Sequence, residues 1–161
     1  TAHVDTGAEL PAELFAKVLA ARHYQSGLQM LRQLEFAIFD LKLHDEYNSN
    51  TANYLQLLNQ VRQEISVLQA PEYNRFANSF GHIFAGGYAA GYYSYKWAEV
   101  LACDVFSRFD GKSGAELSAL GKQFCQTILS QGSLRPMMEN FKTLMGREPQ
   151  IEALIKYSGM H

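Results

Sequence analysis

Side chains that can donate hydrogen bonds are concentrated, together with glycines, in residues 80–97 of this chain. One histidine, four glycines and four tyrosines lie within these eighteen residues. Glycine at this density weakens helices and strands and lets the backbone approach a ligand closely. Tyrosine and histidine supply neutral hydrogen-bond donors on stiff rings. We therefore predict a mobile loop over about residues 81–95 that closes on a polar substrate.

The spacing of the five histidines does not match the common zinc-peptidase motif. In His-Glu-x-x-His, the two histidines bind zinc from one helix face and the glutamate activates a water molecule. No two histidines of this chain are four residues apart, and none is followed by glutamate. His44, with Asp45 and Glu46 after it, comes nearest to the motif but has no second histidine in place. We predict no metal ligands in this chain.

Apolar residues recur at helical spacing along most of the chain, and no stretch of useful length alternates as a strand does. Pro11, Pro136 and Pro149 suit the first turn of a helix. We predict an all-α fold with helices over about residues 11–19, 24–46, 54–68, 93–106, 117–129, 136–144 and 149–155. Breaks are predicted at residues 48–51, with an N-cap, and at Pro71, and Gly159 is predicted to be a C-cap.

Charge and composition exclude several classes of function. The chain has 161 residues, 47% of them hydrophobic, which suits one domain or one part of a larger one. It has 14 basic and 16 acidic residues and a net charge of -2, so electrostatics favour neither nucleic acid nor an anionic membrane as a partner. No apolar run is long enough to span a bilayer, and there is no signal-like N-terminus. We predict a cytoplasmic protein.

Helical spacing indicates structural roles for several residues outside the loop. Four aromatic rings are predicted on this ground to lie in the core: Tyr24, Phe36, Phe39 and Trp97. Arg32 and Glu35 are three residues apart on one predicted helix. We predict that they form a surface ion pair worth less than about 1 kcal/mol.

Segments at residues 6–11, 31–36, 39–44, 98–106 and 146–149, together with the loop from Phe80 to Trp97, resemble one known family. This is the thimet oligopeptidase and oligopeptidase A family of zinc metallopeptidases, and the similarity is greatest to the bacterial branch. The segments occur in the family's order and cover nearly the whole chain. The resemblance implies that residues 1–161 are the C-terminal helical part of the peptidase catalytic domain, with the zinc-bearing part upstream and absent.

The resemblance implies catalytic roles for Tyr95 and His82. The matching tyrosine of the family donates its hydroxyl hydrogen to the oxyanion of the tetrahedral intermediate, where a neutral donor stabilises the transition state more than the ground state. The matching histidine contacts the bound substrate or the transition state. The residues by themselves leave a structural alternative for each: His82 could cap or buttress the loop, and Tyr95 could pack at the start of a helix.

Four further loop residues are predicted to bind substrate: Tyr88, Tyr92, Gly86 and Gly87. Tyr88 is similar to the family's tyrosine that closes on the peptide. Tyr92 is followed by Tyr93, and because adjacent side chains point in different directions, at least one of the two is predicted to pack structurally. For the two glycines, backbone flexibility is favoured over direct contact.

Zinc is the cofactor that the resemblance implies for the full-length parent, carried with its glutamate by the missing N-terminal part. The implied partners are short peptide substrates and that missing part, and the chain alone is predicted to be inactive. The chain begins with Thr1 and not with methionine, which favours truncation or processing. Two alternatives remain: a non-catalytic helical interaction module, and a peptidase whose two parts stay associated after cleavage. A fragment is predicted to expose large apolar patches, because such a fragment has lost its packing partner.

Overall fold

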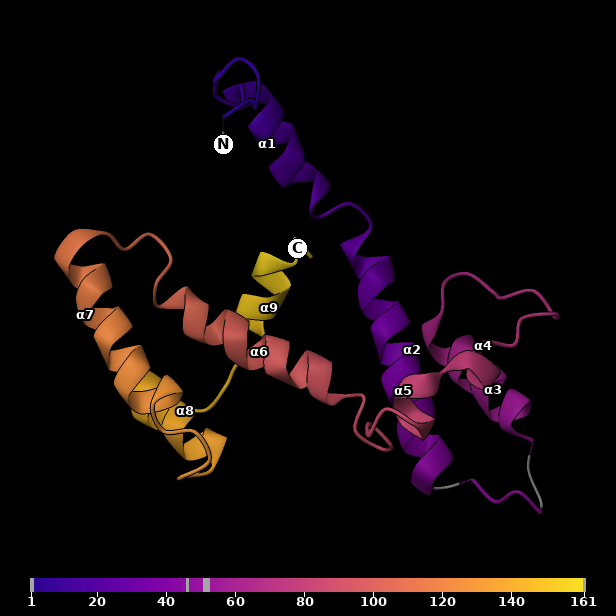
Figure 1. Ribbon diagram of the computed structural model, residues 1–161. Helices are drawn as coiled ribbons and strands as arrows, with labels where there is room; N and C mark the ends of the chain where they lie inside the picture. The colour runs from indigo at the N-terminus through magenta and orange to yellow at the C-terminus, as the bar shows by residue number, and fades with distance from the viewer. Residues whose placement is uncertain (1, 46, 51–52, 161) are drawn as a thin grey trace.

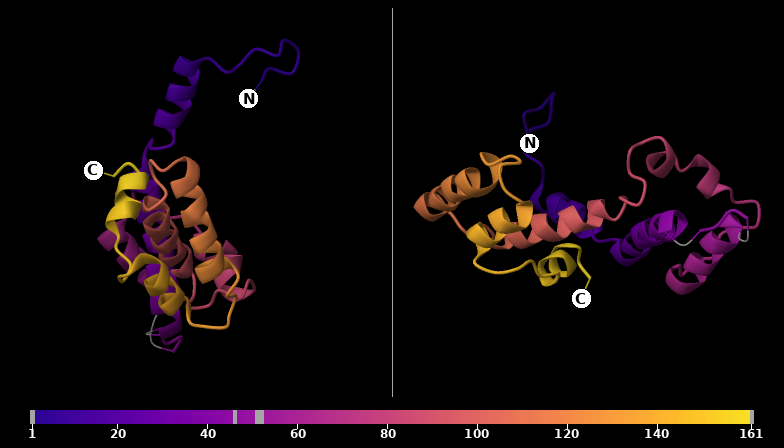
Figure 2. Two further views of the ribbon diagram at one scale, coloured as in Figure 1. Left: turned by 90° about the vertical axis from the view of Figure 1, so that its left-hand side faces the viewer. Right: turned by 90° about the horizontal axis from the view of Figure 1, so that it is seen from below.

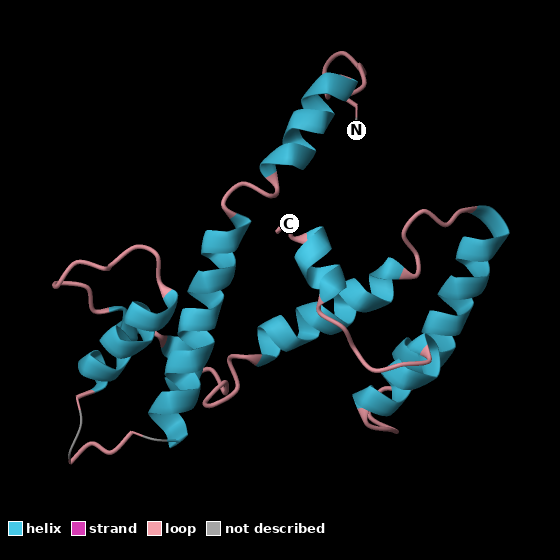
Figure 3. Cartoon of the chain, turned by 180° about the vertical axis from the view of Figure 1, so that it is seen from behind, coloured by secondary structure: helices cyan, strands magenta, loops and turns pink. Residues whose placement is uncertain are grey.

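Helices are the only regular secondary structure in the described part of the chain, apart from one isolated antiparallel bridge between Ala2 and Glu9 (Figure 3). The computed structural model describes residues 2–45, 47–50 and 53–160. Within these residues there is no strand, so the predicted all-α fold class is confirmed. The helices are α1 (Ala12–Ala21), α2 (Ser26–Asp45), α3 (Tyr54–Ile65), α4 (Phe76–Ser79), α5 (Gly81–Phe84), α6 (Ser94–Ser107), α7 (Gly114–Phe124), the π-helical turn η1 (Cys125–Leu129), α8 (Met137–Met145) and α9 (Glu152–Tyr157).

Local residue chemistry explains several of the helix ends. Pro11 precedes the first residue of α1, as the sequence predicts. The side chain of Asn53 caps α3 by accepting a hydrogen bond from the backbone N–H of Leu55 at 2.8 Å, two residues after the predicted break. Gly159 has a φ of 69° just beyond α9, which is the left-handed conformation expected of a C-cap glycine. Glu46, the predicted end of the second helix, lies outside the described residues.

Apart from α1, the helices form two groups, and the loop that leads into α6 joins them (Figure 1). In the first group (α2–α5), the long helix α2 packs against α3, and α4 and α5 lie beside them. In the second group (α6–α9), α6 packs against α8 and α9, and the continuous α7–η1 helix contacts α8 through its π-helical end. The loop between α5 and α6 therefore lies where the two groups meet (Figures 1 and 2).

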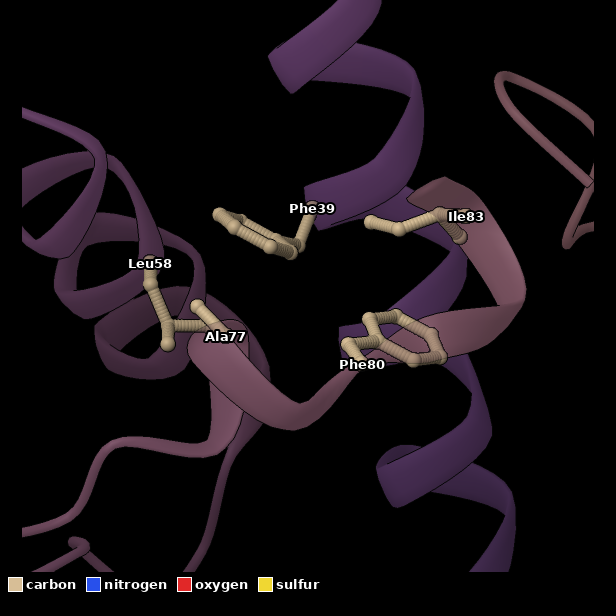
Figure 4. Close-up of a cluster of buried hydrophobic side chains, with 5 residues drawn as sticks. All are labelled: Phe39, Leu58, Ala77, Phe80 and Ile83. Carbon is tan, nitrogen blue, oxygen red and sulfur yellow. The ribbon is translucent and has the colours of Figure 1, made fainter. Parts of the chain in front are cut away.

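The first group has a core of buried apolar side chains (Figure 4), and Tyr92 of the loop packs against it. Its buried apolar side chains come from α2, α3, α4, the residue between α4 and α5, and α5: Phe39, Leu58, Ala77, Phe80 and Ile83. Burying one large apolar side chain contributes about 1.5–3 kcal/mol to stability. Because Ile83 belongs to this core, the short helix α5 is held firmly although it begins with a glycine.

Glu35 corrects the prediction of a surface ion pair with Arg32. The side chain of Glu35 is buried, and it accepts hydrogen bonds from Arg32 at 2.8 Å, from Arg62 at 2.9 Å and from Ser66 at 2.7 Å. Burial alone would raise the pKa of Glu35, but the hydrogen bonds from Ser66 and Arg62 and the charge of Arg32 outweigh it and lower the pKa. The pair is therefore one part of a buried network that ties α2 to α3.

In the second group, Asp104 is likewise a buried carboxylate that joins two parts of the chain. It lies on α6, and the two terminal nitrogens of the Arg147 guanidinium, Nη1 and Nη2, donate to it at 2.7 and 2.6 Å. The backbone N–H of Gln150 donates to it as well, at 2.9 Å. The hydrogen bonds from Arg147 hold the pKa of Asp104 below its ordinary value in spite of burial. These bonds attach the segment between α8 and α9 to α6.

Large apolar side chains are exposed in both groups and on α1, which projects away from the rest of the chain (Figures 1 and 2). None of the ten residues of α1, all of which the structure describes, is buried, and its apolar stripe includes Phe15 and Val18, which are 50% and 52% exposed. Tyr24 is 72% and Trp97 51% exposed, so the prediction that they lie in the core is wrong. It is confirmed for Phe39, which is buried in the core, and for Phe36, which packs against it.

None of the described helices is long and apolar enough to cross a lipid bilayer.

Candidate functional site

The glycine- and tyrosine-rich segment is shorter as a loop than the sequence predicts. Residues 81–84 form α5, and residues 94 and 95 are the first of α6, so the irregular stretch covers only residues 85–93. The cause at the first end is Ile83, whose burial in the core holds one helical turn in place. His82 is therefore presented by α5 and Tyr95 by the first turn of α6, on either side of the loop.

The loop and its flanking helices bring four of the six predicted site residues into one aromatic cluster, made of His82, Tyr88, Tyr92 and Tyr95. The ring centroids of Tyr88 and Tyr95 lie 5.1 Å apart with nearly parallel planes, and those of Tyr92 and Tyr95 are also 5.1 Å apart. The His82 ring centroid is 6.2 Å from that of Tyr88 and 6.0 Å from that of Tyr92. Tyr92 is the partly buried member of the adjacent tyrosine pair, and Tyr93 is exposed, which agrees with the prediction that one of the two packs structurally.

The two predicted glycines shape the backbone of the loop. A Cβ atom added to Gly86 would lie 2.8 Å from the carbonyl oxygen and 2.9 Å from the Cα atom of His82, distances that real Cβ atoms do not tolerate. Gly87 has a φ of 78°, in the left-handed region that favours glycine. The close approach that glycine permits here is thus to the chain's own α5. Contact of either glycine with substrate stays a prediction.

A cleft of about 720 Å³ opens beside the aromatic cluster. His82, Tyr92 and Tyr95 line it together with Gln25, which directly precedes α2, and with further residues of α2 and α6: Leu28, Gln29, Arg32, Gln33, Lys96 and Glu99. Its volume falls in the range of small-molecule and peptide sites. The polar residues of α2 in this lining were missed by sequence reasoning, because only the packing of the loop on α2 turns that face into a cleft wall.

The hydroxyl groups of Tyr95 and Tyr92 are held in the protonated form that donates hydrogen bonds. Hydrogen bonding with Tyr88 raises the pKa of Tyr95 above its ordinary value, and partial desolvation adds to this effect. Burial raises the pKa of Tyr92, although the charge of Arg32 acts in the opposite direction. A phenol of ordinary pKa is already neutral at physiological pH, and the raised pKa values extend the neutral form of both residues to higher pH. Neutral donors beside a cleft can stabilise negative charge that develops on a substrate oxygen.

Comparison with known proteins identifies the family. A model of peptidase family M3 matches residues 1–160. The chain belongs to peptidase family M3. It is 46% identical over 159 residues to oligopeptidase A of Salmonella typhimurium and to that of Escherichia coli, in each case over 98% of this chain and 23% of the relative. A probable cytosolic oligopeptidase A of Arabidopsis thaliana is 43% identical over 162 residues, again covering 98% of this chain and 23% of the relative.

These matches confirm the resemblance that the loop and its flanking segments indicate. This chain spans about a quarter of the length of these curated relatives, 23% of each. It accounts for one portion of such a protein and leaves the larger portion of each relative unmatched.

M3 peptidases are zinc-dependent in general, and the described residues of this chain do not fit a zinc site. No group of three or more His, Cys, Asp or Glu side chains among them is placed to hold a metal ion. The ring of His44, the nearest approach to a zinc motif in the sequence, is turned to Asp40: its Nδ1 atom lies 2.9 Å from the backbone oxygen and 3.0 Å from Oδ1 of that residue. Glu46 lies outside the described residues.

Proposed function

We propose that this chain is the substrate-binding and transition-state-stabilising portion of an M3 oligopeptidase that hydrolyses short peptides. The observation that carries the proposal is the cluster of neutral phenols and His82 beside a cleft, in a chain of a peptidase family. The names of the Salmonella and Escherichia relatives, oligopeptidase A, support peptides as the substrate class.

Tyr95 is the proposed oxyanion donor. When a peptide carbonyl is attacked, negative charge develops on its oxygen, and a fixed neutral donor stabilises that charge most in the transition state. The place of Tyr95 in the first turn of α6 suits this role, because a neutral hydroxyl donor is carried on a regular element. His82, on the opposite side of the loop, is the second catalytic residue and contacts the substrate or the transition state.

Substrate binding falls to the remaining loop residues. Tyr88 offers a hydroxyl donor to the peptide backbone. Tyr92, whose hydroxyl hydrogen is donated to Gln33, offers an acceptor oxygen. Gly86 and Gly87 let the loop take the turn that places both tyrosines. A loop that orients its substrate in this way lowers the entropy cost of reaching the transition state.

Zinc belongs, in this proposal, to the larger portion of the peptidase outside this chain, because the described residues offer no ligand group for it. The exposed apolar stripe of α1 and the exposed rings of Tyr24 and Trp97 suit contact with that portion. We place the complete protein in the cytoplasm. Short peptides are its proposed partners besides its own remaining portion, and nucleic acid and membrane are not among its partners.

The deciding experiment is peptide hydrolysis by the complete peptidase that carries this chain, with and without Tyr95→Phe. The kcat is expected to fall on the order of 100-fold with little change in KM, because only a transition-state interaction is removed. Tyr93→Phe, a neighbouring exposed tyrosine of the same loop, is the matched control and is expected to keep full activity. Unchanged turnover in Tyr95→Phe would remove Tyr95 from the catalytic residues.

The chain on its own is expected to hydrolyse no peptide and to bind zinc weakly or not at all. Tight one-to-one zinc binding that supports peptide cleavage by the isolated chain would contradict this part of the proposal.

A further inference from the structure

Asp40 is a carboxylate buried between α2 and the loop, and no part of the mechanism above uses it. The residue is 0% exposed. Its Oδ1 atom accepts the backbone N–H of Ala90 at 3.0 Å, and its Oδ2 atom accepts that of Tyr92 at 2.9 Å. Burying a carboxylate is strongly unfavourable unless both oxygens have partners. The two loop amides supply those partners from a segment that is fifty residues away in the sequence.

The only charged or titratable side chain paired with Asp40 among the described residues is His44, one helical turn further along α2. Its Nδ1 atom lies 3.0 Å from Oδ1 of Asp40 and 2.9 Å from the Asp40 backbone oxygen. No lysine or arginine of the described chain pairs with this carboxylate. The loop backbone is therefore the main partner of Asp40, in contrast to Glu35 and Asp104, which are paired with arginine.

Ala90 adopts a backbone conformation that needs support. Its φ of 52° lies in the left-handed region, which costs an alanine free energy that a glycine does not lose. Such a residue persists when the surrounding contacts determine it. The bond from its N–H to Asp40 is such a contact, and the bond from the N–H of Tyr92 fixes the backbone two residues later.

Tyr92 is attached to α2 at three points. Its backbone N–H is bonded to Asp40, its ring meets the edge of Phe36 with centroids 5.8 Å apart, and its hydroxyl donates to Oε1 of Gln33 at 3.0 Å. Gln33, Phe36 and Asp40 are spaced three and four residues apart, so they lie along one face of α2. Tyr92 therefore lies along about two turns of α2.

The position of Tyr92 determines the position of the proposed oxyanion donor. Helix α6 begins two residues later, at Ser94, and the ring of Tyr92 lies 5.1 Å from that of Tyr95. Tyr88 in turn stacks on Tyr95. A displacement of residues 90–92 away from α2 would therefore move the start of α6 and both tyrosine rings.

We propose that Asp40, together with Gln33, is a positioning residue: it holds the backbone of Ala90 and Tyr92 against α2 and so sets the place of the Tyr95 and Tyr88 hydroxyls in the cleft. The catalytic consequence rests on the proposed function, whereas the anchoring itself does not.

Amide hydrogen exchange in Asp40→Asn tests the anchoring. An asparagine has nearly the same shape but offers one oxygen where the carboxylate offers two, so one of the two loop amides loses its acceptor. Exchange at Ala90 and Tyr92 in the complete peptidase is expected to become about tenfold faster. Asp104→Asn is the matched control: it removes an oxygen from another buried carboxylate that accepts a backbone N–H, and it should leave exchange at Ala90 and Tyr92 unchanged. Equal acceleration in both variants, or none in Asp40→Asn, would overturn the proposal.

Kinetics and rescue test the positioning role. In Asp40→Asn, kcat/KM for peptide hydrolysis is expected to fall on the order of 10- to 100-fold, mostly through kcat, because the donor is displaced and not removed. Adding Ala90→Gly to Asp40→Asn should raise kcat/KM at least about threefold, since glycine adopts a positive φ without the support of Asp40. A loss that Ala90→Gly leaves unchanged would show that Asp40 acts only through general stability, and the positioning role would be wrong.

Gln33→Leu provides the same test if Asp40→Asn fails to fold. Gln33 is partly exposed on α2, and its replacement removes the bond to the Tyr92 hydroxyl. Because Gln33 also lines the cleft, the NMR measurement on the Tyr92 ring separates this bond from a change in the cleft wall. The Tyr92 ring is expected to flip faster by NMR and kcat to fall, and unchanged values of both would overturn the proposal. Failure of the proposed function would show itself differently: Tyr95→Phe would keep full turnover while exchange at Ala90 and Tyr92 still depended on Asp40.

Discussion

At the residue scale, one side chain of the aromatic cluster changes the pKa of its neighbour. Tyr88 and Tyr95 stack, and hydrogen bonding with Tyr88 is the largest cause of the raised pKa of Tyr95. Tyr88 thus has two roles in this site. It is a proposed contact for the peptide, and it raises the pKa of the proposed oxyanion donor.

The substitution Tyr88→Phe is expected to lower the pKa of Tyr95 toward the ordinary value of a phenol. The hydrogen bond that favours the neutral form is removed, and so is the repulsion from an ionised neighbour, so the Tyr95 hydroxyl should lose its proton at lower pH than in the parent. The measurement is the pH titration of the Tyr95 ring carbon by NMR with labelled tyrosine. Tyr93→Phe is the control, and an unchanged titration in Tyr88→Phe would contradict the assignment.

At the scale of elements, the site depends on how closely the loop backbone follows α5. Gly86 lies against the backbone of His82, so the loop can turn back toward α2 only if residue 86 has no Cβ atom. The core residue Ile83 fixes α5 from the other side. His82 is thus held between the core and the loop.

The substitution Gly86→Ala is expected to displace the loop and lower thermal stability. The added Cβ atom would meet backbone atoms of His82 at 2.8 and 2.9 Å, so α5 or the loop must shift. Such overpacking costs about 1–3 kcal/mol, which thermal unfolding would detect. Gly121→Ala on α7 is the matched control, since an added Cβ meets nothing within 4 Å there and alanine favours a helix. A Gly86→Ala variant as stable as Gly121→Ala would contradict the close approach.

At the scale of the whole molecule, large apolar side chains are exposed on α1 and on both helical groups. The stripe on α1 and large side chains on both helical groups face solvent, as predicted for a chain that packs against a further portion of its protein. Because α1 buries none of its described residues, its own packing within this chain contributes little to stability.

The isolated chain is therefore expected to self-associate through α1, and Val18→Lys should reduce that association without lowering thermal stability. Val18 is 52% exposed within the apolar stripe, so a charge there is tolerated by the chain but opposes an apolar contact. Sedimentation velocity measures the effect. Ala20→Lys adds the same charge on the opposite face of α1 and is expected to leave association unchanged. Equal behaviour of the two variants would contradict a docking role for the stripe.

The sequence by itself determined the all-α class, most helix ends and the residues of the aromatic cluster. These features depend on short-range chemistry: apolar spacing, the φ preferences of glycine and proline, and the donor groups of tyrosine and histidine. The resemblance to the M3 peptidases added proposed roles for Tyr95 and His82, because the match extends over residues 1–160 and includes both positions.

Only the tertiary structure decided what lies opposite each helix face. Helical spacing alone placed Trp97 in the core and Glu35 on the surface, whereas Trp97 is exposed and Glu35 is buried with Arg62. Asp40 could not be found from the sequence, because its role comes from two amides fifty or more residues away. Spacing along a helix shows which residues share a face, but burial and partners depend on the element that packs there, and distant parts of the chain supply that element.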